Sequence, residues 1–71
     1  MFQIQACWAG YIILQSKVDS EEALEVHLSE LEAHFFEGME YTVHGSTMPL
    51  KVLTVDVMCR GNIFRQVDFK K

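Results

Sequence analysis

The sequence has few of the residues that usually stabilise a small protein and none of the common catalytic motifs. Its 71 residues include only two cysteines and one proline. No apolar run approaches the ~18 residues of a membrane-spanning helix. The N-terminus shows no basic stretch followed by an apolar one, so we expect no secretory signal and a cytoplasmic location. Cys7 and Cys59 lie far from any CxxC spacing, and we expect reduced, buried thiols that act as small hydrophobes.

Catalytic and cofactor-binding motifs are also missing. The chain contains no GxSxG, P-loop or GxGxxG pattern, so we expect neither an enzyme nor a bound cofactor. His27, Glu30 and His34 would share one edge of a helix. The two histidines would be about 10.5 Å apart along the helix axis, too far for direct bonds to one ion. We therefore expect no metal site.

The composition indicates one small folded domain spanning residues 1–71. Apolar residues make up 49% of the chain, which is typical of a globular protein. A domain of this size has a marginal core and often depends on a second subunit or a partner. The net charge of −4 argues against a general nucleic-acid binder, which would normally be basic.

Alternation of apolar and polar residues predicts strands at both ends of the chain. The expected strands are residues 2–8, 11–15, 39–44, 51–59 and 63–69, with a loop at 45–49. Ala9-Gly10 has two interpretations, a hairpin turn or a bulge within one long strand, and we favour the hairpin.

A helix is expected over residues 20–37. Asp19 or Ser20 can cap it, Glu22 stands at a capping-box distance from Asp19, and Gly38 suits its C-terminal end. The apolar stripe that would face the sheet comprises Leu24, Leu28, Leu31 and Phe35, whereas Val26 and Phe36 lie off it.

The turn at residues 60–62 sets the register of the last hairpin. A two-residue turn would oppose Val55 to Gln66, whereas a three-residue turn opposes Val55 to Val67. Because the second choice matches apolar with apolar, we predict it, with Asn62 in the left-handed conformation. The predicted pairs are Leu53–Phe69, Val55–Val67, Val57–Arg65 and Cys59–Ile63.

The predicted fold is α+β, with the order β-β-α-β-β-β. An antiparallel sheet of four or five strands would carry one helix packed across one face. One helix cannot cover both faces, so the opposite face of the sheet would be exposed. In the predicted register that face carries the apolar residues Ile12, Leu14, Met58 and Phe64, with Val52 nearby. We predict that this apolar patch binds a target or a second copy, giving a homodimer.

Charge is distributed very unevenly along the chain. Residues 19–40 hold eight acids and no Lys or Arg, whereas residues 41–71 hold five of the six bases. Concentrated negative potential attracts a basic partner and raises its rate of association. We therefore predict that the acidic helix docks on a protein with a basic, nucleic-acid-binding surface. The candidate contact residues are Glu21, Glu22, Glu25 and Glu32.

Two alternatives belong to other functional classes. The C-terminal hairpin could form a nucleic-acid-binding module, since it interleaves bases with Phe64 and Phe69. The bases concerned are Arg60, Arg65, Lys70 and Lys71. The acidic segment would repel phosphate, so we expect direct nucleic-acid binding less than protein binding. The other alternative is a structural subunit of a larger complex.

In size, acidity and lack of catalytic motifs the chain resembles small phage and mobile-element proteins. Proteins of that kind bind and block host machinery, including CRISPR effectors and other nucleic-acid enzymes. The resemblance is one of composition and not of sequence, and it implies an inhibitor.

Overall fold

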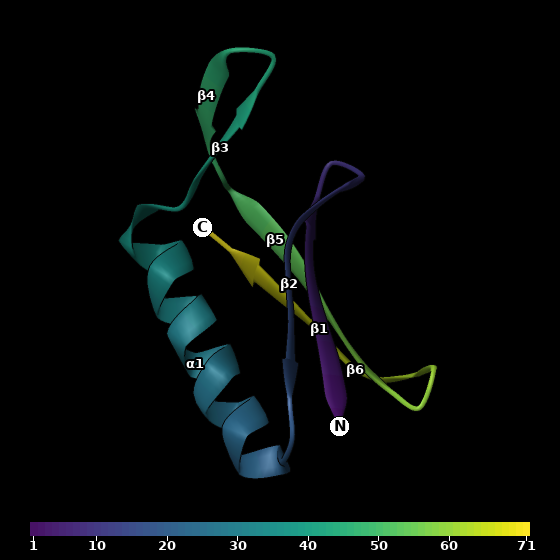
Figure 1. Cartoon of the computed structure of the whole chain (residues 1–71). Coiled ribbons are helices and arrows are strands. Elements are labelled where there is room, and N and C mark those ends of the chain that lie inside the picture. Colours follow the sequence, from purple (N-terminus) through teal and green to yellow (C-terminus); the bar gives the residue numbers. More distant parts are fainter.

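Four antiparallel strands and one helix form the body of the protein. The computed structural model describes all residues 1–71. Its elements are β1 (Phe2–Trp8), β2 (Tyr11–Val18), α1 (Glu21–Gly38), β3 (Glu40–Val43), β4 (Ser46–Pro49), β5 (Val52–Cys59) and β6 (Asn62–Lys70). The sheet has the order β2-β1-β5-β6, and α1 lies along one side of it (Figure 1). The predicted α+β fold is therefore confirmed. The helix does not combine the length and apolar character that crossing a bilayer requires.

The helix begins and ends within one residue of the predicted bounds. Ser20 is its N-cap, because the Ser20 Oγ accepts a hydrogen bond of 3.1 Å from the backbone N–H of Ala23. Asp19, the other candidate, does not fill this position. At the far end Gly38 has a φ of 129°, a conformation that residues with a side chain rarely adopt, so glycine lets the chain leave the helix here.

The core lies between α1 and the sheet and is entirely apolar. The predicted stripe of four helix residues is buried, as are alternate residues of β1 from Phe2 to Ala6 and of the middle of β5. The twelve buried residues are Phe2, Ile4, Ala6, Leu24, Leu28, Leu31, Phe35, Leu50, Leu53, Val55, Val57 and Phe69. No polar or charged residue is buried. Burial of the strand residues with a period of two fixes which side of the sheet faces α1.

All three hairpins close with two residues at positive φ, as type I′ turns require. The turn residues are Ala9 (50°) and Gly10 (84°), His44 (51°) and Gly45 (81°), and Arg60 (54°) and Gly61 (79°). The first pair confirms the hairpin at Ala9-Gly10. The last pair shows that the predicted three-residue turn is wrong, because Asn62 already belongs to β6.

A bulge in β6 explains why most of the predicted register is nevertheless correct. Cys59 pairs with Asn62, and not with Ile63 as predicted. The register then shifts, and Phe64 has no partner on β5. Beyond this extra residue the three other predicted pairs are all present. The turn itself has two residues, and the bulge adds one more residue to β6. Apolar residues therefore still pair with apolar residues, as they would after a three-residue turn.

The first hairpin contains a matching irregularity, and β2 is longer than predicted. Cys7 pairs with Ile12, Ala6 pairs with Leu14, and Ile13 between them is the extra residue. The strand then continues to Val18, well past the expected end at residue 15. Both bulges lie on the edge strands of the sheet, where they twist the strand and hinder pairing with other chains.

The segment expected to be a loop at residues 45–49 is largely a strand. Ser46–Pro49 forms β4, which pairs with β3 in a separate two-stranded sheet. This hairpin projects beyond the main sheet, at the top of Figure 1. Its base is tied by a hydrogen bond of 2.9 Å from the Leu50 N–H to the Met39 carbonyl. The predicted third strand therefore exists, but it adds nothing to the main sheet.

Candidate functional site

The face of the sheet turned away from α1, here called the open face, is polar. Its residues are Ile12, Gln15 and Lys17 of β2, Gln3, Gln5 and Cys7 of β1, Val52, Thr54, Asp56 and Met58 of β5, and Ile63, Gln66, Asp68 and Lys70 of β6. A row of Gln15, Gln5, Asp56 and Gln66 crosses all four strands. The Gln66 Nε2 donates a hydrogen bond of 2.9 Å to the Asp56 Oδ1. The predicted apolar patch is therefore correct for Ile12, Met58 and Val52 and wrong for Leu14 and Phe64.

The two bulges account for this correction. Leu14 pairs with the buried Ala6, so its side chain lies on the side of the sheet that carries α1. The Phe64 ring lies 5.0 Å from the ring of Phe2, a core residue, so Phe64 also belongs to that side. Ile12 and Met58 of the predicted patch remain on the open face, as does Val52. The row of polar residues separates Met58, which pairs with Ile63, from Ile12 and Val52.

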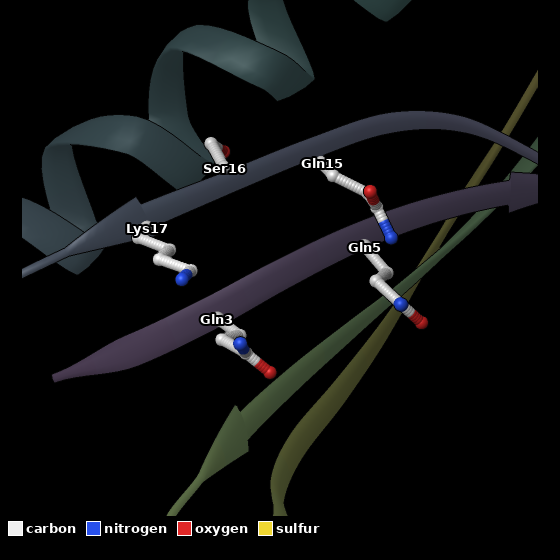
Figure 2. A pocket seen from close by; sticks show the side chains of 5 residues that line it. All are labelled: Gln3, Gln5, Gln15, Ser16 and Lys17. Carbon is white, nitrogen blue, oxygen red and sulfur yellow. The ribbon is translucent and has the colours of Figure 1, made fainter.

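A hollow with a volume of about 290 Å³ lies over β1 and β2. It is lined by Gln3, Gln5, Gln15, Ser16 and Lys17. Figure 2 shows the glutamine and lysine side chains extending on the side away from the helix, with Ser16 toward it. Ser16 is hydrogen-bonded to the Nε2 of His27 at 2.9 Å. The hollow offers amide and ammonium groups for hydrogen bonding to a polar partner.

Most acids of α1 have no basic partner. The exceptions are Glu37, whose Oε2 lies 4.0 Å from His34 Nδ1, and Glu25, whose Oε1 lies 2.7 Å from Arg65 Nη1. Both side chains are substantially exposed, so this ion pair contributes less than about 1 kcal/mol to stability. The candidates Glu21, Glu22 and Glu32 are exposed and within ion-pair distance of no Lys or Arg. Three of the four predicted helix residues therefore present free carboxylates to solvent.

The bases of the C-terminal hairpin are not gathered into one patch. Arg60 lies in the turn and Lys70 at the opposite end of β6, a separation of about 30 Å at ~3.4 Å per residue. Arg65 lies between them and is bound to Glu25. The Lys71 ammonium is 5.2 Å from the centre of the Phe35 ring. This layout gives a nucleic-acid strand no continuous basic track.

An aromatic cluster joins the two hairpins that meet at one end of the molecule. The Tyr41 ring lies 6.0 Å from the ring of Trp8 and 6.2 Å from that of Tyr11. Sequence reasoning missed this cluster because its members come from β1, β2 and β3, and only the tertiary structure brings those strands together. Its contacts fix the β3–β4 hairpin beside the first turn.

The two cysteines are unpaired and distant from one another. Cys7 lies at one end of β1, whereas Cys59 pairs with Phe2 at the other end. Cys7 pairs with Thr54 and Ile12 on the open face, while Cys59 packs against the core. The thiols are unpaired, as predicted, but the prediction that they are buried is wrong, because both are only half-buried.

No family model matches this chain, and no curated protein or solved structure matches it either. The surfaces described above are therefore the basis for a functional proposal.

Proposed function

We propose that this chain is a small non-enzymatic interaction protein that binds a basic protein surface through the acidic outer side of α1. The observation that carries the proposal is the set of exposed helix carboxylates, of which only Glu25 has a Lys or Arg partner. Uncompensated like charges repel one another, and a basic partner relieves that repulsion. The free thiols fit a reducing compartment, so we place this interaction in the cytoplasm.

The partner we propose handles nucleic acid. A protein surface that binds phosphates presents clustered Lys and Arg. Their charge is complementary to that of a helix that bears many carboxylates and no Lys or Arg. The helix would occupy the place of the phosphates, so binding would block the partner, in the manner of a phage or mobile-element inhibitor.

Charge reversal on the helix is expected to abolish this binding while the fold persists. The test variant is Glu30→Lys with Glu32→Lys, because neither residue lies in the first helical turn or contacts Arg65. The control is Gln3→Lys, Gln15→Lys and Asp68→Lys on the open face. Both variants raise the net charge from −4 to zero. Affinity capture from the native host identifies the partner, and calorimetry on the purified partner gives the affinities.

We expect wild type and control to bind alike, and the helix variant to bind at least about tenfold more weakly, mainly through slower association. The partner's own nucleic acid should compete with the chain. Equal affinity of the helix variant and the control, or no competition, would show that the proposal is wrong. Circular dichroism checks that both variants remain folded.

We also propose a homodimer, formed at the end of the sheet that carries the last turn. The open face does not support the interface predicted from the sequence, because it is polar. Large apolar residues are exposed on both sides of this end, however: Ile63 (63%) lies on the open face, Phe64 (45%) lies on the side that carries α1, and Met1 (69%) precedes β1. Sedimentation equilibrium should show a dimer for the wild type and a monomer for Ile63→Glu. A wild-type monomer at high concentration would contradict the proposal.

A further inference from the structure

We infer that the outer side of α1 pairs with an amphipathic helix of the partner whose flanks are basic. This inference depends on the proposed function, since it names the kind of element that the acidic helix would bind. Four residues carry it, Val26, Ser29, Ala33 and Phe36, here called the outer stripe. All four are exposed, and they lie on the side of α1 away from the buried stripe.

The spacing of the outer stripe is that of a helix-pairing seam. Its members follow one another at +3, +4 and +3, the a and d positions of a heptad. The stripe spans about 15 Å along the helix axis. The core residues of α1 fall on the remaining positions of the same heptad. One helix therefore carries two apolar sides, and the sheet covers only one of them.

The two ends of the outer stripe can anchor a second helix. Val26 is 58% and Phe36 53% exposed, and they are the two large apolar residues of α1 that lie outside the core. The Phe36 ring packs edge-on against the buried Phe35, with 5.1 Å between ring centres. Ser29 and Ala33 between them are small, which lets another helix approach to about 8–10 Å between axes.

The positions that flank the stripe decide what kind of helix fits. In this heptad the e positions are Glu30 and Glu37, and the g positions are Glu25 and Glu32. All four flanking positions are therefore acidic. Residues at e and g set partner choice in paired helices. A second copy of α1 would bring Glu against Glu, whereas a helix with Lys or Arg at its flanks would form ion pairs along both sides. The occupant is thus a basic-flanked helix of another protein and not a second copy of this chain.

Synthetic peptides test this inference directly. The probe is a three-heptad helical peptide with Leu at a and d and Lys at e and g. A second peptide has the same composition in scrambled order, without the apolar seam, and a third has Glu in place of Lys. Fluorescence anisotropy measures the affinity of each for the intact protein. We expect the Lys probe to bind at least about tenfold more tightly than the scrambled peptide, and the Glu peptide not to bind.

Variants of the protein distinguish the contribution of the apolar outer stripe to peptide binding from that of charge. Phe36→Ser removes an anchor without changing charge and should weaken binding of the Lys probe about tenfold. Met48→Ser, at an exposed apolar residue of β4 that belongs to neither proposed interface, is the control and should have no effect. If the scrambled peptide binds as tightly as the Lys probe and Phe36→Ser has no effect, helix pairing is overturned while acidic docking stands. If no peptide binds, helix pairing is likewise overturned, and the charge-reversal experiment still decides the proposed function.

Discussion

Phe35→Ala is expected to unfold the protein, whereas Phe36→Ala, one residue further along α1, should leave it folded. Phe35 is fully buried, and its ring lies 5.9 Å from that of Phe69 and beneath the Lys71 ammonium. Removing a buried phenyl ring costs about 3–5 kcal/mol, from lost burial and from the cavity left behind. A core in a chain of this length rarely supplies more than about 3–5 kcal/mol of net stability, so the loss approaches the whole.

Urea unfolding followed by circular dichroism measures this difference. Phe36 is 53% exposed, so truncation of its side chain should lower the free energy of unfolding by less than about 1 kcal/mol. The pair of variants has identical chemistry and differs only in the side of the helix. Similar losses for both variants would mean that α1 does not pack on the sheet through the stripe that contains Phe35.

Ala6→Lys is the second change with a large expected effect, and it tests which face of the sheet is open. Ala6 is fully buried in the middle of β1, between Leu14 on one neighbouring strand and Val55 on the other. A lysine here would bury an ammonium without a partner or displace α1, at a cost of more than about 4 kcal/mol. We expect the variant to be unfolded by circular dichroism and by the loss of amide dispersion in its NMR spectrum.

Gln5→Lys is the matched control on the same strand. Gln5 projects onto the open face beside Asp56, so a lysine there gains an opposite charge across the strands. We expect the free energy of unfolding to change by less than about 1 kcal/mol. A folded Ala6→Lys together with an unfolded Gln5→Lys would reverse the assignment of the two faces.

The polar open face changes which surfaces of this protein would drive its association with other chains. An exposed apolar sheet would have forced association, because each buried Å² of apolar surface is worth roughly 25 cal/mol. The apolar residues that remain exposed are instead divided among separate places. They lie on the outer stripe of α1, at the last turn, and beside the aromatic cluster of Trp8, Tyr11 and Tyr41. We therefore expect association to depend on these separate surfaces and their charges. It does not depend on burying one whole face of the sheet.

The sequence alone determined what depends on near neighbours in the chain. The buried stripe of α1 and a cap at Asp19 or Ser20 followed from periodicity and from the chemistry of helix ends, and the structure selected Ser20. The strands of the main sheet and the opposition of Val55 to Val67 followed from alternation. The concentration of acids in residues 19–40 is a property of the sequence and needed no structure.

Only the tertiary structure decided which side of the sheet each side chain occupies. One extra residue in a strand moves every later side chain to the other face, so the bulges at Ile13 and Phe64 reassigned Leu14 and Phe64. The tertiary structure also placed β3 and β4 in a separate two-stranded sheet. It brought Arg65 and Glu25 together as an ion pair. Bulges and such contacts arise from fitting twisted strands against one another and against a helix. That fit depends on residues far apart in the chain, and local preference does not encode it.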